Sequence, residues 1–357
     1  MKSKQLTHTF QRAWFCCLSA LLLFSVSSCR SGEKKIAPEQ TPSTLVVAYL
    51  PMWRMPYTPD WEKLTHVCLA FGYVQQDGEL DRTEVNQHQQ VIREAHDHGV
   101  NVLLSIGGGG SKNFSSALLH PEYRARLVEN LSIAVKDLDL DGIDVDYEEW
   151  DGGQQGASET DLQRLEVLEL FYKELREKLG SDKWITAAVN ASWDNGGFGL
   201  YNCFNNTMHK YLDFVSLMIY DETGPWSKER TGPHSSWDFF EKAIEHWLTN
   251  RHLPKEKLVA GVPFYGYRFL QEGDATGAQG MGYRNILEQY PEENAHLKDN
   301  IGLLYYDGRP TIERKARYIQ QHQLGGIMFW EITQDTTDPE KSLLVAIDHI
   351  LRPKDKK

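Results

Sequence analysis

Eight short β-rich runs recur along the chain, and helical patterns lie between most of them. Most of these runs are nearly continuous in apolar residues, which is typical of parallel strands buried on both faces. Alternation of strand and helix predicts an α/β fold, the (β/α)8 or TIM barrel. A doubly wound open sheet is disfavoured because no glycine-rich phosphate turn follows the first run. The predicted strands are residues 45–50, 66–74, 101–107, 142–148, 184–190, 214–221, 258–265 and 326–332, and the predicted helices are residues 83–98, 121–137, 161–179, 236–250, 312–323 and 343–351.

Residues 1–28 have the pattern of a lipoprotein-type signal peptide. Lys2, Lys4 and Arg12 form a basic region before a short apolar run at residues 13–26, which is too short for a comfortable membrane span. The run leads into the sequence VSSC at residues 26–29, which resembles the lipobox of bacterial lipoproteins, so we expect Cys29 to be lipidated. We therefore expect an exported protein on the periplasmic face or cell surface of a bacterial membrane, held by the lipid anchor only. The alternative is ordinary secretion after cleavage nearby.

The rest of the chain is predicted to hold one folded domain. Residues 29–44 are polar and contain proline, which predicts a flexible tether. The predicted catalytic barrel covers residues 45–351, and residues 352–357 form a basic tail. We expect a monomer, although the sequence itself does not specify the oligomeric state.

Charge and cysteine content exclude several classes of function. The 357 residues carry a formal net charge of −12, which argues against nucleic-acid binding and against anchoring through a basic surface patch. No cysteine–histidine cluster has the spacing of a zinc site, and we expect no metal and no cofactor. Cys68 and Cys203 are interpreted as unpaired thiols, with Cys68 inside a buried strand.

A row of acids interrupts the apolar run that begins at Gly142. In a strand, Asp144, Asp146 and Glu148 would share one face, because successive side chains alternate between faces. Three neighbouring carboxyls cannot all be ionised in a low-dielectric site, so at least one should hold a proton near neutral pH. A carboxyl kept protonated in this way can serve as a general acid. By the same alternation Glu149 points to the other face, so Glu148 is the preferred acid.

Residues 137–148 also satisfy a competing pattern, the calcium loop D-x-[DN]-x-[DN]-G-x5-E. Two features disfavour this interpretation. The eighth position of such a loop should be apolar, but here it is Asp144. The loop should also run into a helix, whereas Gly152 and Gly153 would break one. We therefore favour the strand.

Aromatic residues are frequent at the carboxyl ends of the predicted strands, where the chemistry of such barrels lies. Acids combined with exposed aromatic faces suit a sugar, whose C–H face stacks on rings. The alternative is that these rings fill the core. Both interpretations remain open for Phe71 and Phe264, whereas a functional role is favoured for Trp226. The candidate substrate-binding residues are Tyr49, Trp53, Phe71, Gly107, Gly108, Asn190, Asp221, Tyr265 and Trp330.

Several motifs occur in the order, and on the strands, that one known family shows. They are D-x-x-D-x-D-x-E at residues 141–148, S-x-G-G at 105–108, M-x-Y-D at 218–221, GVPFYG at 261–266, and Trp330. The chain thereby resembles glycoside hydrolase family 18, the family of chitinases and endo-β-N-acetylglucosaminidases. The resemblance spans most of the chain from Leu45 onward and implies a glycosidase on a TIM barrel.

The resemblance also implies a substrate-assisted mechanism with retention of configuration. Glu148 would protonate the glycosidic oxygen, while the carbonyl oxygen of the substrate's own 2-acetamido group would act as the nucleophile. Asp146 would orient the acetamido N–H and stabilise the cationic intermediate, and Asp144 would share a proton with Asp146. Tyr220 would donate its hydroxyl to the acetamido oxygen. These four are the candidate catalytic residues.

For the substrate, the resemblance implies a polysaccharide or glycan that contains N-acetylglucosamine, cut at β-1,4 bonds; chitin and chitooligosaccharides are the first expectation. Asp221 would bind sugar hydroxyls and Trp330 would form the floor of the sugar pocket. Only residues 268–307 are available for the insertion that follows the seventh strand, which indicates an open groove and leaves the chitobiose core of N-glycans as an alternative. A non-catalytic sugar-binding barrel is a third hypothesis, disfavoured because Glu148, Asp146 and Tyr220 are all present.

Overall fold

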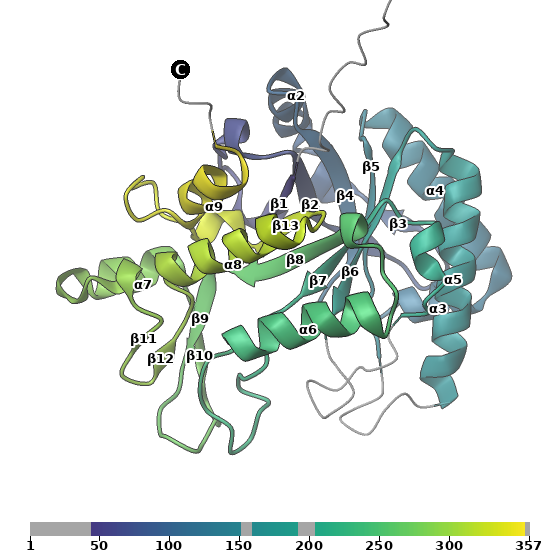
Figure 1. The fold of residues 1–357 in the computed structure, drawn as a ribbon. Coiled ribbons are helices and arrows are strands. Elements are labelled where there is room, and N and C mark those ends of the chain that lie inside the picture. The colour runs from purple at the N-terminus through teal and green to yellow at the C-terminus, as the bar shows by residue number, and fades with distance from the viewer. Residues whose placement is uncertain (1–43, 151–158, 192–203, 354–357) are drawn as a thin grey trace, which may run out of the picture. The chain divides into compact units, whose positions relative to one another are not determined.

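The computed structural model describes residues 44–150, 159–191 and 204–353 of the protein (Figure 1). The predicted signal peptide, Cys29, Cys203 and nearly all of the tether lie outside these ranges. Within them, none of the helices combines the length and the apolar character that crossing a membrane requires.

Eight parallel strands of the described chain close into a barrel, which confirms the predicted fold. Their order is β1-β13-β8-β7-β6-β5-β4-β2, and β1 also pairs with β2, so the sheet has no free edge. The strands are β1 (Leu45–Pro51), β2 (His66–Val74), β4 (Asn101–Gly107), β5 (Gly142–Asp146), β6 (Trp184–Asn190), β7 (Phe214–Met218), β8 (Leu258–Pro263) and β13 (Gly326–Trp330).

Side-chain alternation along the strands divides the core into two clusters. On β1, Val46 and Ala48 belong to the large cluster, whereas Val47 and Tyr49 belong to a small one together with Cys68 and other residues. The small cluster takes its members from several strands, as expected for residues that face the barrel interior. The large cluster also includes buried positions of the helices, so it joins strands to the helical layer.

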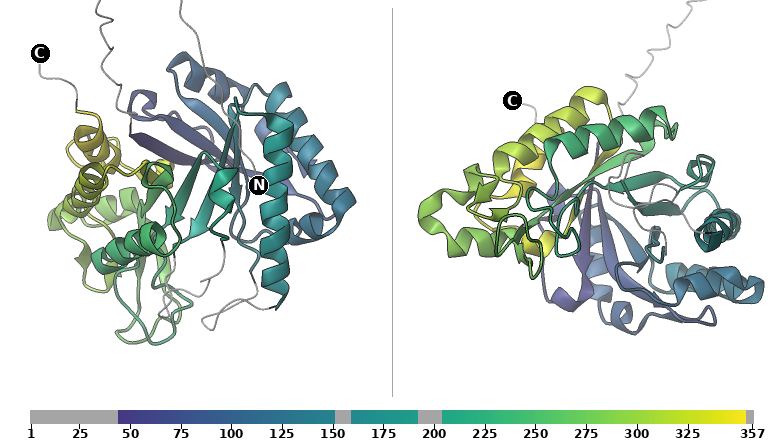
Figure 2. Two further views of the ribbon diagram at one scale, coloured as in Figure 1. Left: turned by 45° about the vertical axis from the view of Figure 1, so that its right-hand side comes forward. Right: turned by 90° about the horizontal axis from the view of Figure 1, so that it is seen from below.

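Helices lie around the outside of the strands (Figures 1 and 2). Their apolar stripes face the sheet; in α5, for example, Leu165, Leu168, Phe171 and Leu175 are buried at helical spacing. The main helices are α1 (Thr83–Asn86), α2 (Gln89–Asp97), α3 (Phe114–Leu119), α4 (Pro121–Asp137), α5 (Glu159–Leu179), α6 (Trp237–Thr249), α8 (Arg309–His322) and α9 (Leu343–Leu351).

The single helix predicted at residues 83–98 is wrong, because the chain forms the two helices α1 and α2 there. At the break, the N–H groups of Gln87 and His88 bond to carbonyls three residues back, so the first helix tightens and ends. Val85 is the one buried residue of α1, so little packing holds a longer first helix against the barrel.

Several predicted strands extend past their hydrogen-bonded ladders. β5 ends at Asp146 instead of 148, β7 at Met218 instead of 221, and β13 at Trp330 instead of 332. The residues that follow β7 and β13 are still largely buried, and after β5 buried Tyr147 and then exposed Glu148 continue the alternation, whereas the pairing stops at the barrel mouth. The side chains beyond the ladder are then free to turn toward a common cavity.

The predicted insertion after the seventh barrel strand is present and contains a small antiparallel sheet with strand order β10-β9-β12-β11 (Figure 1, lower left). Its elements are β9 (Tyr265–Arg268), β10 (Gln279–Gly282), α7 (Tyr283–Gln289), β11 (Asn300–Ile301) and β12 (Leu304–Tyr305). The insertion begins directly after β8, so Tyr265 belongs to this sheet and not to the barrel strand to which the sequence assigned it. A two-residue strand, β3 (Leu80–Asp81), pairs antiparallel with β2 and was not predicted.

Candidate active site

A cavity of about 280 Å³ opens at the carboxyl ends of the barrel strands. Most of the predicted site residues line it, although they come from strands far apart in the sequence. Gly109, Ala188 and Met218 line it as well but were not predicted. The lining residues are Tyr49, Trp53, Phe71, Gly109, Asp146, Glu148, Ala188, Met218, Tyr220, Asp221 and Trp330.

Register and motif position could have identified two of the missed residues. Ala188 pairs with Asp146 between β5 and β6, so it sits at the same level of the barrel. Met218 is the first residue of the M-x-Y-D motif and ends β7. Asn190 ends β6 but is not among the lining residues, so its role as a binding residue stays a prediction.

Asp144 lies fully buried beneath the cavity and is surrounded by hydroxyl donors. Tyr49 and Ser105 each donate to Oδ2 at 2.7 Å, and Thr186 donates to Oδ1 at 2.6 Å. Burial raises the pKa of the Asp144 carboxyl, while these three hydrogen bonds act in the opposite direction. Both carboxylate oxygens therefore accept hydrogen bonds from side chains of β1, β4 and β6, so Asp144 is fixed in place.

Asp146 is almost as buried, with 4% of its surface exposed, but one of its oxygens lacks a partner. Within the described part of the chain, Oδ1 of Asp146 accepts no hydrogen bond. Burial first, and then the charges of Glu148 and Asp144, raise the pKa of Asp146 well above its usual value. A buried acceptor without a donor is costly, so Asp146 is suited to bind a ligand group that supplies an N–H or O–H.

Glu148 follows Asp146 at the mouth and is open to solvent on one side. Protein atoms of the cavity nevertheless replace much of the water around its carboxyl. This desolvation, and then the charge of Asp221, raises the pKa of Glu148 to about 7. Glu148 can therefore hold a proton at neutral pH and below, as the sequence predicts for a general acid.

Glycines at the end of β4 and in the loop that follows allow the backbone to pass close behind the acid row. A Cβ atom on Gly107 would lie 2.1 Å from the Asp146 carbonyl oxygen, and one on Gly108 would lie 2.4 Å from the Phe71 ring. Gly107 and Gly108 have φ of 103° and 82°, values that favour glycine. Gly109, and not these two, lines the cavity, so the structure places Gly107 and Gly108 behind Asp146 and Phe71.

Tyr220 and Asp221 follow the end of β7 and also line the cavity. Burial raises the pKa of Tyr220 well above its usual value, so its hydroxyl keeps its proton and can donate a hydrogen bond. The Tyr265 hydroxyl donates to Oδ1 of Asp221 at 2.5 Å. Tyr265 does not line the cavity itself and instead supports Asp221 from behind.

Three rings form the aromatic wall of the cavity. Trp330 and Phe71 are stacked, with ring centroids 5.8 Å apart and planes 16° apart, while Trp53 lies against both. Trp53 is 49% exposed and Phe71 only 7%, so one ring faces solvent and the other is part of the inner core. Phe71 is thus buried and also lines the cavity, and its role as a binding residue stays a prediction. Trp226 is 43% exposed and packs edge-on against Tyr267.

Glu149 points away from the cavity, as the alternation predicts, but its carboxyl has its own set of partners. Oε1 accepts from the Ser111 hydroxyl at 2.5 Å and from the Phe114 N–H at 2.9 Å, and Oε2 accepts from the Ser115 N–H at 2.7 Å. Burial opposes the ionised form, yet these hydrogen bonds lower the pKa of Glu149 below its usual value. Glu149 thus ties the end of the acid row to the start of α3.

The acids of the calcium pattern have other partners in the fold. Asp137 pairs with Arg82 at 2.9 Å, and Asp141 accepts from the Val102 N–H at 2.7 Å and from the His96 ring at 2.9 Å. In the described ranges no group of three or more histidine, cysteine, aspartate or glutamate side chains is arranged to hold a metal ion. The strand interpretation of this stretch is confirmed by β5.

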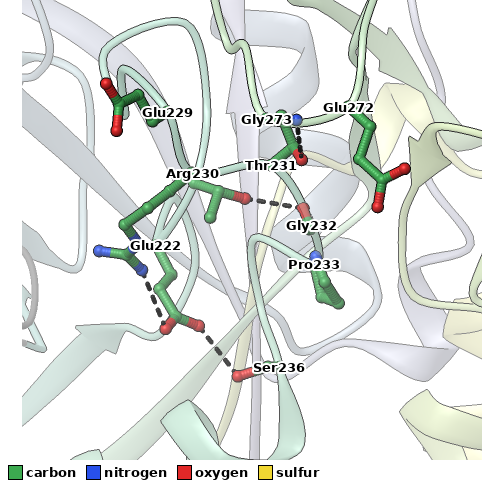
Figure 3. A pocket seen from close by; sticks show the side chains of 10 residues that line it. Glu222, Glu229, Arg230, Thr231, Gly232, Pro233, Ser236, Glu272 and Gly273 are labelled. Atoms are coloured by element: carbon green, nitrogen blue, oxygen red, sulfur yellow. Dashed lines mark hydrogen bonds and ion pairs between the residues drawn. The ribbon is translucent and has the colours of Figure 1, made fainter.

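A larger cavity of about 430 Å³ lies at the loop that follows β7, beside the segment around Gly273 (Figure 3). Its lining is polar, with Glu222, Glu229 and Glu272 among the residues, and it contains no aromatic side chain. Figure 3 shows Arg230 and Ser236 both directed toward Glu222. The Arg230 guanidinium donates to Oε1 of Glu222 at 3.3 Å, and the Ser236 hydroxyl donates to Oε2 at 2.9 Å. The smaller cavity is therefore the better candidate, because it combines the perturbed carboxyls with the aromatic wall.

Comparison with known proteins shows the family to which this chain belongs. A sequence model for "Glycosyl hydrolases family 18" matches residues 45–335. The chain belongs to glycosyl hydrolase family 18. That match contains every residue that lines the smaller cavity, from Tyr49 to Trp330, so the pocket lies inside the region that the chain shares with the family.

Solved structures of family 18 resemble the chain over most of its length. A chitinase from Bacteroides thetaiotaomicron is 29% identical with a TM-score of 0.77, and the likeness covers 88% of this chain and 98% of that chain. The family 18 chitinase ChiB from the chitin utilization locus of Flavobacterium johnsoniae is 29% identical with a TM-score of 0.71, and the likeness covers 87% of this chain and 94% of that chain.

Among proteins compared by sequence, Chitinase 63 of Streptomyces plicatus is 28% identical over 82% of this chain, and the match spans only 56% of that protein.

Proposed function

We propose that the protein hydrolyses β-1,4 bonds next to N-acetylglucosamine in chitin or chitooligosaccharides by substrate-assisted catalysis. The observation that carries this proposal is the row Asp144, Asp146 and Glu148, in which the outermost carboxyl has a pKa raised to about 7. The similar chitinases of Bacteroides thetaiotaomicron and Flavobacterium johnsoniae support chitin as the substrate class.

In the first step, Glu148 gives its proton to the glycosidic oxygen as the bond from that oxygen to the anomeric carbon breaks. The carbonyl oxygen of the 2-acetamido group attacks the anomeric carbon from the other side and forms a cyclic oxazolinium ion. The leaving sugar departs with a neutral hydroxyl, and Glu148 becomes a carboxylate. In the second step, Glu148 takes a proton from water, the water oxygen bonds to the anomeric carbon, and the ring opens with net retention.

Asp146 and Tyr220 have the chemistry that the intermediate requires. The unpartnered Oδ1 of Asp146 would accept the acetamido N–H, and its negative charge would stabilise the cation. The protonated hydroxyl of Tyr220 would donate to the acetamido oxygen and hold it for attack. Asp144 is held by three hydroxyls beneath and would share a proton with Asp146, so the carboxyls titrate as one coupled unit.

A second candidate is an endo-β-N-acetylglucosaminidase that cuts the chitobiose core of N-glycans. The short insertion between β8 and α8 favours it, because its four strands are only two to four residues long and leave little to wall a deep groove. A binding protein without activity is the third candidate, and the presence of Glu148 at the end of the row argues against it.

Product analysis on three substrates side by side tests these alternatives. Chitooligosaccharides should be cut, a high-mannose glycoprotein should be cut only if the second candidate holds, and cellooligosaccharides should remain intact because they lack the nucleophile. Efficient cleavage of cellooligosaccharides would contradict substrate assistance. Release of intact glycan, with no chitooligosaccharide products, would replace the first candidate by the second.

We also propose that the protein is exported and anchored through a lipid on Cys29, as the VSSC sequence at residues 26–29 indicates. A Cys29→Ala variant, expressed in a bacterial host with lipoprotein processing, should lose the incorporation of labelled palmitate that the wild-type protein shows. Palmitate incorporation that persists in this variant would contradict the anchor.

A further inference from the structure

A buried histidine that the sequence did not single out lies directly behind the pocket. His234 is 1% exposed and comes from the loop between β7 and α6, 13 residues after Asp221. Its Nδ1 lies 3.4 Å from the Asp221 backbone N–H donor and 3.2 Å from Oδ1 of the same residue. Its Nε2 lies 3.0 Å from the Tyr265 carbonyl oxygen.

Two of these contacts match one neutral tautomer of the ring, whereas the contact with Oδ1 of Asp221 would be a hydrogen bond only with a proton on Nδ1. With the proton on Nε2, the ring donates to the Tyr265 carbonyl oxygen, and Nδ1 accepts from the Asp221 N–H. The ring also packs against Tyr265 and Tyr267, with centroid distances of 4.8 Å and 5.1 Å. A single side chain therefore touches both the backbone of Asp221 and the tyrosine that donates to its carboxylate.

The backbone of Asp221 needs such a contact because its conformation is unusual. Its φ is 65°, in the left-handed region that residues with a Cβ atom rarely adopt. Residues in this region persist where the surroundings impose the conformation. Asp221 in this conformation lines the pocket.

The segment that carries His234 is itself fixed by a buried ion pair. Lys315 on α8 has no exposed surface and donates to the carbonyl and hydroxyl oxygens of Ser235, both at 2.7 Å. It also pairs with Asp307 at 2.7 Å. The Ser235 hydroxyl in turn donates to the Ile219 carbonyl oxygen at 2.6 Å, immediately before the M-x-Y-D motif ends in Tyr220 and Asp221.

We propose that His234 is a positioning residue of the active site, which holds Asp221 and Tyr265 against the pocket, and that Lys315 and Asp307 hold His234 in place. The proposal rests on the proposed glycosidase reaction only where it predicts kinetics. Its structural claim concerns the position of the Asp221 carboxylate, which can be followed without a substrate through the titration of Glu148.

Glu148 reports that position, because the charge of Asp221 is one of the two causes that raise its pKa. If Asp221 loses its support and swings toward water, its effect on Glu148 weakens and the titration midpoint of Glu148 falls. The other titratable groups that face His234 are Tyr265 and Tyr267 on the inserted sheet and Asp307 before α8. None of these is altered in the variants below.

The test uses His234→Phe, which keeps the ring and removes both nitrogen contacts, and His234→Asn as a milder variant that can keep a contact near Nδ1. The matched control is His66→Asn, because His66 is also buried, at 2% exposed, but begins β2 at the opposite end of the strands. Carbon-13 NMR titration of Glu148 gives its midpoint without substrate, and kcat/KM is measured on chitooligosaccharides against pH. Thermal unfolding reports whether each variant is folded.

We expect the Glu148 midpoint to fall in His234→Phe and kcat/KM to drop by about 10- to 100-fold, the size typical of a misplaced active-site group. His234→Asn should recover part of both effects, and His66→Asn should change neither. A folded His234→Phe variant with the wild-type midpoint, or one that differs no more than His66→Asn, overturns the proposal. If the wild-type protein fails to cut chitooligosaccharides, the proposed function fails, while the midpoint still decides the role of His234. If His234→Phe does not fold, the same criteria apply to His234→Asn.

Discussion

Glu148 and Glu149 are adjacent in the sequence, but their surroundings give them opposite acid–base properties. The pKa of Glu148 is raised to about 7, whereas that of Glu149 is lowered from its ordinary value of 4.5. Glu148 faces a cavity that holds the Asp221 charge, while Glu149 receives hydrogen bonds from two backbone N–H groups and one hydroxyl at the start of α3.

The comparison teaches that exposure to water alone does not set the ionisation of these carboxyls. Burial raises the pKa of both carboxyls. At Glu148 the charge of Asp221 adds to this effect, whereas at Glu149 the hydrogen bonds from one hydroxyl and two N–H groups outweigh it. One residue is thereby suited to donate a proton and the other to anchor a helix.

The largest expected effect separates the two glutamates by activity. Glu148→Gln should lower kcat by about 10²–10⁴-fold, because the proton donor is lost, while binding of N-acetylglucosamine oligomers persists. Glu149→Gln is the matched control and should keep kcat within about threefold of wild type, since its carboxyl does not face the cavity. Kinetics on chitooligosaccharides and calorimetric binding check both variants. Equal losses in the two variants would remove the distinction.

A second test changes the surroundings of Glu148 and leaves the residue itself in place. In the wild-type protein, kcat/KM should decline as pH rises through about 7, where Glu148 loses its proton. Asp221→Asn removes a negative charge that favours the protonated form, so this alkaline limb should move to lower pH. A shift of about one pKa unit would lower kcat/KM about tenfold further at pH values above both limbs. A limb that stays in place, or moves to higher pH, would contradict the role of Asp221.

A third test measures how much Glu149 contributes to the free energy of unfolding. Glu149→Gln should lower the free energy of unfolding by about 1–3 kcal/mol, the usual worth of hydrogen bonds to a charged group. Because the folded pKa of Glu149 is lowered, its contribution is present above the unfolded value near 4.5 and is lost as pH falls through the folded value. Urea unfolding of both proteins at pH 7 and pH 3 should therefore give a difference that shrinks in acid. A difference that grows in acid would mean that Glu149 is not an ionised anchor.

The smallest expected effect is that of a chelator. The acid row is proposed to act through protons, so EDTA should leave kcat/KM unchanged within error. Two acids of the calcium pattern already have protein partners: Asp137 pairs with Arg82, and Asp141 accepts hydrogen bonds from Val102 and His96. A strong loss of activity that calcium restores would revive the calcium loop.

The sequence predicts the barrel, the order of its strands and most residues of the cavity, because each depends on a local pattern. Strand ends are predicted less well, since the pattern of buried residues continues past the last ladder hydrogen bond of β5, β7 and β13. His234 was missed for a different reason. Its contacts with Asp221 and Tyr265 are 13 and 31 residues away in the chain, and no local pattern reports them.

For the two glutamates as well, the sequence predicts one part of their roles and the tertiary structure decides the other. The sequence by itself determined which carboxyls share a face, because a strand has a period of two residues and the acids at 144, 146 and 148 follow it. Only the tertiary structure decided how each one ionises. The hydroxyls of Tyr49, Ser105 and Thr186, the Asp221 charge and the donors of α3 reach these carboxyls from other strands and loops, and a pKa depends on all of them.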